Sequence, residues 1–247
     1  RKRLITVLSK NQRAANYFES NKKLVPDATH SAKDTLVTSH WVTLYEAIGD
    51  LPELRAEKGK NKRDDFNPLH KVPLLDEKKL FWVDNTPEGE TAFNNQCVNP
   101  ACLYQGNQTH GASHNKNGIN KAHTDTPLFC EKCGAVLPRP WVEDKNGNKR
   151  LMKGFVSAYK RMLWSEPAST LTQNFQYACS DNKIHPSQSR VLSLYEGLVL
   201  QSISEYDYSF VVNGKMSSDG IIRDTIGESV PPKVIDMICR LIIELSQ

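Results

Sequence analysis

Residues 185–203 read HPSQSRVLSLYEGLVLQSI, and this stretch predicts how the parts of the chain are joined. His185 precedes Pro186, and a residue before proline is kept away from the α region, so the stretch begins as an extended loop. Ser193 stands three residues before Glu196. This S-x-x-E spacing is typical of a capping box and predicts that a helix begins there.

An apolar face follows the cap, because three residues recur at helical spacing: Leu194, Leu198 and Val199. Arg190 lies just before this helix, where it would either reach a phosphate or orient the loop. Taken alone, the stretch indicates an amphipathic helix with a basic entry loop.

Size and composition fit an ordinary globular protein with one large domain or two small ones. The chain has 247 residues, of which 38% are hydrophobic and 24% are charged. Its longest apolar candidate, residues 234–245, is interrupted by Asp236, Arg240 and Glu244, so we expect no membrane span. No secretion signal is visible, and the start at Arg1 without a methionine suggests a fragment or a processed chain.

Positive charge is concentrated in the N-terminal quarter of the chain. The net charge is +4, but residues 1–63 contain 13 Lys or Arg and 7 Asp or Glu. This excess is compatible with a polyanionic partner. Within it, residues 55–65 read RAEKGKNKRDD, which indicates either a mobile surface loop or a loop that contacts phosphates.

Short elements separated by irregular segments are expected along the rest of the chain. The sequence predicts a buried strand at residues 4–8, a short helix or loop at 10–20, a helix at 41–51, an Asn146-Gly147 hairpin at 141–152, mainly β structure at 151–177, a strand at 206–212, and a helix from Pro231-Pro232 to about Leu245. Residues 66–93 are expected to be irregular, and Gly227 is expected to permit a sharp turn.

Four of the six cysteines form two close pairs, Cys97-x4-Cys102 and Cys130-x2-Cys133. Each pair presents two thiolates to one point, which is the arrangement of a zinc ribbon. Because four cysteines complete a tetrahedral shell, the predicted zinc is structural and not catalytic. The alternatives are reduced, buried cysteines without metal, or substitution by a histidine of the intervening segment: His110, His114 or His123.

The two remaining cysteines, Cys179 and Cys239, are isolated and are predicted to be small core residues. The sequence contains no Gly-rich nucleotide loop, no H-E-x-x-H and no G-x-S-x-G. It therefore carries no complete catalytic centre that a motif identifies.

Separated segments together resemble the C-terminal half of DNA (cytosine-5)-methyltransferases. Residues 1–7 (RKRLITV) look like the end of that family's Q-x-R-x-R motif with its following strand. Residues 190–201 match its R-x-L-[ST]-x-x-E…L-Q motif, and residues 226–232 (IGESVPP) are similar to its motif X. Residues 164–172 (WSEPASTLT) resemble the Thr-Leu segment of its target recognition domain. The order and spacing of these segments make the match specific.

The resemblance implies double-stranded DNA as the substrate and S-adenosylmethionine as the cofactor. In that family a cysteine thiolate adds to a flipped-out cytosine, whose C5 then attacks the methyl group of the cofactor. The Pro-Cys, Glu-Asn-Val and Phe-x-Gly-x-Gly motifs of this chemistry do not occur in the sequence. We therefore expect the chain to be inactive by itself and to need an N-terminal catalytic half, in the same or a separate polypeptide.

Individual residues receive roles from the same resemblance. Arg3 matches the arginine that faces the flipped cytosine, and Arg1 matches its companion. Ser229 and Val230 match positions near the cofactor pocket. Glu228 stands where the family usually has Asn, and an ionised carboxylate there would accept a hydrogen bond but not donate one.

Further residues are candidates for DNA binding. Thr170 matches the threonine that touches the DNA backbone near the flipped base. Arg190 matches the arginine that supports the recognition domain, where we expect it to organise the junction, and it is also a candidate DNA contact. In the hairpin, three basic residues are candidates for reading bases, against the alternative of an exposed turn: Lys145, Lys149 and Arg150.

These expectations combine into an α+β fold. Residues 1–19 would be a C-terminal strand region of the catalytic domain, and residues 20–185 an irregular, β-rich target recognition domain with an inserted four-cysteine zinc ribbon at 97–133. Residues 186–212 would form the junction, and residues 213–247 the helix that returns to the catalytic domain. The terminal strand and helix would belong to an α/β S-adenosylmethionine-dependent methyltransferase domain.

The leading function is therefore cytosine-5 methylation of DNA in a bacterial restriction–modification system, with this chain supplying target recognition and part of the active-site and cofactor-pocket wall. Two alternatives stay open: a non-catalytic zinc-ribbon DNA-binding or adaptor protein, and one subunit of a split methyltransferase. We expect a cytoplasmic protein that is associated with the nucleoid when it is bound to DNA.

Overall fold

The computed structural model describes residues 10–21, 26–33, 35–114, 120–122 and 126–246. Arg1, Arg3 and the strand predicted at residues 4–8 lie outside the described residues. Within them the helices are α1 (Gln12–Asn21), α2 (Leu44–Ile48), α3 (Glu77–Asp84), α4 (Leu194–Leu200), α5 (Asp219–Glu228) and α6 (Pro232–Ser246), and short 3-10 turns occupy Ala92–Asn94 and Ile203–Glu205.

The strands are two or three residues long: β1 (His30–Ser31), β2 (Ser39–His40), β3 (Ala112–His114), β4 (Asn120–Ala122), β5 (Trp141–Glu143), β6 (Lys149–Leu151), β7 (Val211–Val212) and β8 (Lys215–Met216). They form separate two-stranded ladders, of which β1–β2 is parallel and the others are antiparallel. The structure thus mixes helices with small sheets. The described part of residues 20–185 is irregular as predicted but not β-rich, because its backbone groups mostly pair between loops.

The hairpin predicted at Asn146-Gly147 is confirmed, because β5 and β6 pair on either side of it. The carboxylate of Asp144 stabilises the turn by accepting the N–H groups of Asn146 and Asn148 at 2.8 and 2.9 Å. Gly147 has φ +81°, a left-handed conformation that glycine adopts without steric cost.

Of two other β predictions, one is wrong and one is too long. Residues 151–177 contain the end of β6 and isolated bridges, but otherwise turns and irregular backbone. Residues 206–212 are paired only at Val211–Val212, which turns through Asn213 and Gly214 into β8. An alternating apolar pattern produces a long strand only where a neighbouring strand supplies backbone partners.

Four helices lie where helical patterns were predicted: α1, α2, α4 and α6. Helix α2 is shorter than the predicted residues 41–51, because a capping box between Thr43 and Glu46 starts it late. Helices α3 and α5 were not predicted. Their caps are Asp76, which accepts the Lys79 N–H, and Ser218.

Gly227 lies inside α5 and makes no sharp turn, so that prediction is wrong. A β-carbon at this position would stand 2.3 Å from the backbone nitrogen of Gln173 and 2.4 Å from the carbonyl carbon of Thr172. The glycine therefore permits the close approach of two backbones.

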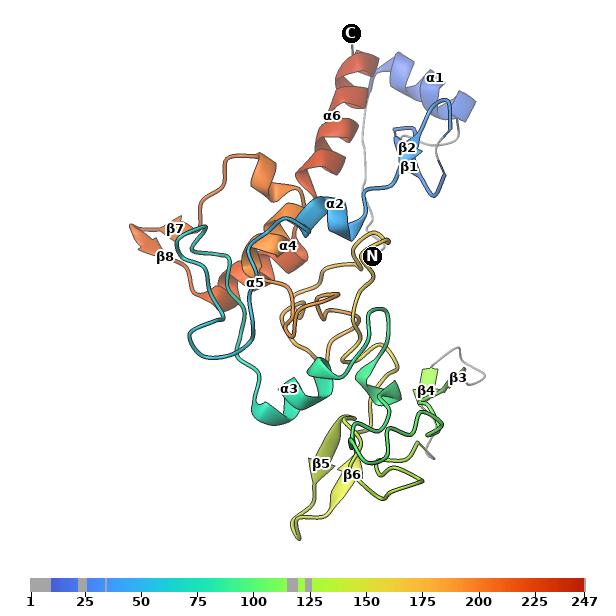
Figure 1. Ribbon diagram of the computed structural model, residues 1–247. Coiled ribbons are helices and arrows are strands. Elements are labelled where there is room, and N and C mark those ends of the chain that lie inside the picture. The colour runs from blue at the N-terminus through green and yellow to red at the C-terminus, as the bar shows by residue number, and fades with distance from the viewer. Residues whose placement is uncertain (1–9, 22–25, 34, 115–119, 123–125, 247) are drawn as a thin grey trace.

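Two apolar cores organise the chain. One surrounds α3 and includes Trp82, Phe93 and Tyr159. The other joins α2, α4 and α5, with Phe175 and Leu198 fully buried in it. Figure 1 shows α2, α4 and α5 together in the middle of the molecule, with the β5–β6 hairpin at the end opposite α6. Helix α4 therefore belongs to the centre of the molecule.

A buried arginine, Arg139, fastens three loops, and no carboxylate among the described residues forms an ion pair with it. Its Nε donates to the carbonyl of Asn95 at 2.8 Å, and its Nη1 donates to the carbonyls of Gln108 and Pro127 at 2.8 and 2.7 Å. Burial lowers the pKa of Arg139 to about 10, so the guanidinium stays charged at neutral pH.

Arg161 plays the same part at the end of α3. It donates to the carbonyls of Val83, Thr86, His185 and Gln188 at 2.7–2.9 Å. These bonds tie the end of α3 to the loop that precedes α4. Buried carbonyls from irregular segments thus find their partners in side chains rather than in ladders.

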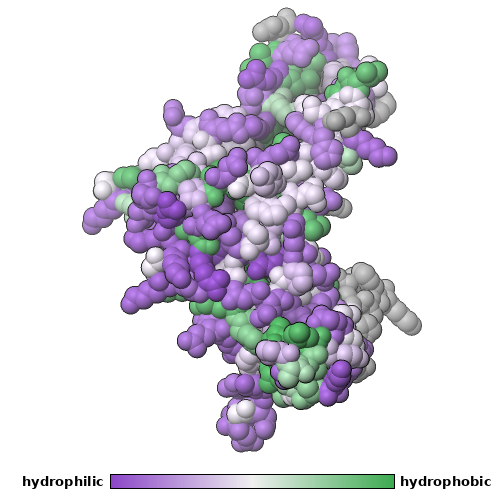
Figure 2. All heavy atoms as spheres, viewed as in Figure 1, coloured by the Kyte–Doolittle hydropathy of each residue, from purple (hydrophilic) through white to green (hydrophobic). Residues whose placement is uncertain are grey.

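Helix α6 extends from the body of the molecule, with α1 beside it (Figure 1). Its Ile238 is buried, but four other apolar residues are exposed: Val234, Ile235, Ile242 and Ile243. Figure 2 shows hydrophobic atoms on the surface of this end. In the part of the chain that the structure describes, no helix is long and apolar enough to cross a membrane.

Candidate functional site

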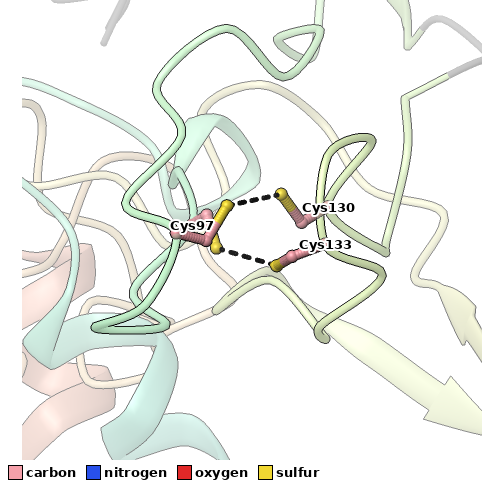
Figure 3. Close-up of side chains that lie close together, drawn as sticks. Cys97, Cys130 and Cys133 are labelled. Carbon is pink, nitrogen blue, oxygen red and sulfur yellow. Dashed lines mark hydrogen bonds between the residues drawn. The ribbon is translucent and has the colours of Figure 1, made fainter.

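The four paired cysteines meet at one point. Cys97, Cys102, Cys130 and Cys133 place their Sγ atoms within 4.8 Å of one another. The Cys97–Cys133 and Cys102–Cys130 Sγ separations are 3.6 and 3.9 Å. Zinc bound at about 2.3 Å from each sulfur requires sulfurs about 3.8 Å apart, so this donor set fits a tetrahedral zinc ion. Figure 3 shows the sulfurs of Cys97, Cys130 and Cys133 facing one centre.

Each cysteine pair lies on a tight turn that ends in a left-handed residue. Gly134 follows Cys133 with φ +71° and donates its N–H to the Cys130 carbonyl at 2.8 Å. Leu103 follows Cys102 with φ +47°. Glycine adopts this conformation without steric cost, whereas the first turn holds a leucine in the same region.

The surroundings of the thiols differ between the two turns. Burial opposes ionisation of Cys130, but the N–H groups of Cys133 and Lys132 lower the pKa of its thiol to about 6. Burial raises the pKa of the Cys102 thiol to about 11. Asn99 donates to the Cys133 sulfur at 3.7 Å and so links the two turns. A cation at the centre supplies the charge that would ionise all four thiols together.

Histidine does not join the four-cysteine cluster among the residues whose side chains are described. His110 is instead bonded to the hydroxyl of Thr126 at 3.0 Å and stacked on Phe93 with ring centres 4.5 Å apart. The side chains of His114 and His123 lie outside the described part of the chain.

The two remaining cysteines are exposed, so the prediction that they are core residues is wrong. Cys239 follows the buried Ile238 and lies on the solvent side of α6. Cys179 lies in a turn after the buried Ala178. A helix or turn that buries one residue exposes its neighbour, and an isolated cysteine gives no signal for either side.

A second candidate site lies where the start of α6 faces the Thr-Leu segment. It is a pocket of about 430 Å³ that is lined by Thr170, Ser229 and Val230. Gln201, which donates to the Ile226 carbonyl at 3.0 Å, lines it too. The fold thus brings a residue predicted to touch DNA next to two residues predicted to face the cofactor.

Glu228 is turned away from this pocket. Its exposed carboxylate accepts a hydrogen bond from Gln173 across the α5 contact. Ser229 ends α5, because its N–H donates to the Thr225 carbonyl at 3.0 Å and its hydroxyl to the Ile226 carbonyl at 2.8 Å. Of the three residues predicted to bind cofactor, two line the pocket and Glu228 does not.

Arg190 is buried, which corrects the prediction that it contacts DNA. Its Nη1 and Nη2 each lie 2.7 Å from a carboxylate oxygen of Glu196, and the two side chains are 1% and 0% exposed. Burial disfavours the charge on Glu196, but Arg190 outweighs burial and lowers the pKa of this carboxyl to about 2. The same carboxylate accepts the Ser193 N–H at 2.7 Å, so Arg190 fastens the loop to the start of α4.

The basic residues of the hairpin are exposed: Lys145, Lys149 and Arg150. The Lys149 ammonium lies 5.0 Å from the centre of the Trp141 ring. None of the three lines the pocket that contains Thr170. Their role in reading DNA stays a prediction.

Two buried polar residues were missed by the sequence reasoning. His70 bonds through Nδ1 to the hydroxyl of Ser193 at 3.0 Å and donates through Nε2 to the Pro52 carbonyl at 2.7 Å. Lys183 is 1% exposed and donates to the hydroxyl of Ser169 at 2.7 Å, and burial lowers its pKa to about 8. Neither position carries a local signal, because burial arises only when distant segments meet.

Comparison with known proteins adds one relationship. The chain is similar to the type II methyltransferase M1.HgaI of Avibacterium volantium, with 26% identity over 211 residues. The match covers 81% of this chain and 43% of the relative, so the chain spans less than half of the relative's length. This similarity supports a relationship to methyltransferases. No protein-family profile matches the chain.

Proposed function

We propose that the chain is the part of a DNA (cytosine-5)-methyltransferase that recognises the DNA target and completes the active-site and cofactor-pocket wall. The pocket shared by Thr170, Ser229 and Val230 carries this proposal. The family resemblance assigns these residues to the DNA side and the cofactor side of one reaction, and the fold brings them together. The similarity to a type II methyltransferase supports DNA methylation in a restriction–modification system.

In this proposal S-adenosylmethionine supplies the methyl group, and an N-terminal catalytic half supplies the thiolate and most of the cofactor pocket. Ser229 and Val230 form the wall that the cofactor contacts, and Thr170 holds the DNA backbone near the reacting base. Arg190 acts indirectly by orienting α4. The other residues assigned to DNA are two that support the flipped base and three in the hairpin: Arg1, Arg3, Lys145, Lys149 and Arg150.

The zinc centre has a folding role in this proposal. Zinc bound by the four cysteines would hold residues 97–133 in shape, a segment too polar to pack a core of its own. Residues 1–19 and helix α6 would pack on the catalytic half, and residues 20–185 would face the DNA.

The direct test is methyl transfer from labelled S-adenosylmethionine to duplex DNA of mixed sequence. We expect label in the DNA when this chain acts together with the catalytic half, and none when it acts alone. Nucleoside analysis should identify 5-methylcytosine as the product. Methylation of an amino group of adenine or cytosine would replace the cytosine-5 assignment. Failure of the complete protein to label any duplex would overturn the enzymatic role and leave a zinc-dependent DNA-binding or adaptor protein.

A further inference from the structure

A basic groove lies between the loop at residues 53–63 and the turn at residues 187–189. Its volume is about 600 Å³. One wall carries four cationic side chains and one acidic one: Arg55, Lys60, Lys62, Arg63 and Glu53. The other wall is the turn that leads into Arg190 and α4. Figure 2 shows hydrophilic atoms over the part of the molecule where this loop lies in Figure 1.

The backbone of the basic loop is fastened to the body of the protein. Asn61 and Val72 exchange hydrogen bonds of 3.0 and 2.9 Å, between the Asn61 amide and the Val72 carbonyl and between the Val72 N–H and the Asn61 carbonyl. The Arg55 N–H donates to the Lys60 carbonyl at 2.9 Å, and the Ala56 N–H donates to the turn at 187–189. The backbone that carries the cationic side chains is therefore fixed along the groove, which favours a loop that contacts phosphates over a mobile surface loop.

The cationic side chains pair with carboxylates that are exposed or half-buried. Arg55 pairs with Glu57 and, at 2.8 Å, with Asp84. Lys60 pairs with Glu57 at 3.3 Å, and Arg63 pairs with Asp65 at 2.8 Å. The Arg63 and Asp65 side chains are 43% and 66% exposed. Lys62 and Asp64 form a third exposed pair. Ion pairs in water contribute little to stability, so a phosphate can replace each carboxylate.

The opposite wall offers hydrogen-bond donors. The Gln188 side-chain oxygen accepts the Leu54 N–H at 2.9 Å and the Arg190 Nε–H at 2.7 Å. These two bonds fix the orientation of the Gln188 side-chain amide. Its NH2 group has no hydrogen-bond partner among the described residues. The hydroxyl of Ser187 adds another donor to the same wall. A groove with cations on one side and neutral donors on the other suits the oxygens of a phosphodiester.

We propose that this groove binds the sugar–phosphate backbone of duplex DNA. The inference rests on the proposed function, but it adds a contact outside every residue that the family resemblance assigns. It also gives the contact a structural consequence. The turn that would hold the phosphate continues into Arg190, whose ion pair with Glu196 sets the start of α4. DNA bound in the groove therefore stabilises the joint on which the pocket of Thr170 and Ser229 depends.

The test is the salt dependence of DNA binding by the complete protein, measured by fluorescence anisotropy with a labelled duplex of mixed sequence. Each phosphate contact contributes about 0.9 to the slope of log K against log salt concentration. The triple variant Lys60→Gln, Lys62→Gln, Arg63→Gln should lower this slope by about 2 to 3 and weaken binding at least about tenfold. A matched variant that removes the same charge elsewhere should keep the wild-type slope: Lys215→Gln, Lys233→Gln, Arg240→Gln.

Removing the acidic partners of the groove cations should have the opposite effect on DNA binding. The variant Asp64→Asn, Asp65→Asn releases Lys62 and Arg63 from their pairs, so it should tighten DNA binding. Equal slopes for the wild type and the Lys60 triple variant, or equal losses in both triple variants, would overturn the groove. If the wild type itself does not bind DNA, the proposed function fails instead. Circular dichroism and melting temperatures confirm that each variant is folded.

Discussion

His185 is a buried imidazole that serves as a hydrogen-bond acceptor. Its Nδ1 accepts the N–H groups of Ser187 and Gln188 at 3.3 and 3.0 Å, and its ring meets the edge of Trp164 with centres 4.9 Å apart. Burial and then the nearby charge of Arg190 lower the pKa of His185 to about 3. The neutral ring therefore holds the turn that forms one wall of the basic groove.

Lowering the pH should destabilise the folded protein through His185. The unfolded chain takes up a proton at His185 below pH ~6.5, whereas the folded protein does so only near pH 3, so stability is full above the first value and falls as pH drops toward the second. The expected fall approaches about 1.4 kcal/mol per pH unit for one such group. His70, whose pKa burial also lowers, contributes with the same sign.

Urea unfolding at a series of pH values measures the effect. His185→Gln removes the titrating group, so the free energy of unfolding should vary less steeply between pH 6 and 5. His30→Gln, which changes an exposed histidine, is the matched control and should leave the slope as it is in the wild type. An unchanged slope in the His185 variant would contradict the explanation.

The role of a single residue can be predicted from the sequence when its partner lies close to it in the chain. The spacing of Ser193 and Glu196 predicts the start of α4, because the capping partners are three residues apart. The partner of His70 is Ser193, and their separation of 123 residues leaves no trace in the sequence pattern. Arg190 shows both cases: its position beside α4 could be predicted from the sequence, but its burial could not.

Helices and strands differ in the same way in how well the sequence predicts them. Helices with a regular apolar spacing were predicted, since this spacing depends on neighbours in the chain, whereas α3 and α5 were missed although Asp76 and Ser218 cap them. Strands depend on partners that the sequence does not display, so the β structure predicted at residues 151–177 is wrong and the strand predicted at 206–212 is reduced to Val211–Val212. The four cysteines were readable because the metal that they fit imposes short spacings of its own.

The zinc centre should determine the folding of the segment around it. Beside its cysteines, the small cluster at this centre buries a single other residue, Leu137, so it has little apolar core without a metal. We expect about one zinc per chain by elemental analysis. Chelation, or the change Cys133→Ser, should increase amide exchange in the parts of residues 97–133 that carry the cysteine turns.

The change Cys179→Ser tests the specificity of that result, because Cys179 is exposed and outside the cluster. It should leave the zinc content and the exchange pattern as they are. A metal-free protein with the original melting temperature and exchange protection would show that these cysteines do not need zinc.

Substitution of one glycine of α5 by alanine should destabilise the protein, whereas the same substitution at another glycine should not. Gly227→Ala places a carbon against the backbone of Thr172 and Gln173, so we expect a loss of about 1–3 kcal/mol or more in the free energy of unfolding. Gly220→Ala, in the same helix, meets only the Ser218 hydroxyl at 4.0 Å and should be neutral or stabilising by up to about 1 kcal/mol. Equal melting temperatures for the two variants would mean that α5 does not press on this segment.

At the scale of the whole molecule, the fold could be predicted only in outline. The mixture of helices and small sheets and the irregular middle were readable from the sequence. The two cores, and the arginines that hold loops together between them, were not, because they join segments of distant number. The pocket at Thr170 and Ser229 was implied by resemblance, and only folding brings its sides together.

The apolar side of α6 should make the isolated chain self-associate. Ile235 and Ile243 are 39% and 56% exposed, and a contiguous apolar patch of this kind favours association. The variant Ile235→Gln, Ile243→Gln should stay monomeric at concentrations where the wild type sediments as larger species. Glu244→Gln, a change on an exposed polar residue of the same helix, should behave as the wild type.

Addition of the catalytic half should suppress the association of the wild type, if that half covers α6. Sedimentation velocity measures both effects. A wild-type chain that is monomeric at every concentration would show that α1 already covers enough of the helix.

The three loops gathered by Arg139 have a practical consequence for engineering. The carbonyls of Gln108 and Pro127 are bound by the same guanidinium nitrogen, and just beyond them the buried His110 is bonded to Thr126. A loop whose two stems are anchored at one atom can change its length and sequence while the scaffold stays in place. A new segment can therefore be grafted between His110 and Thr126, and under the proposed function such a graft would test whether this part of the chain reads the DNA target.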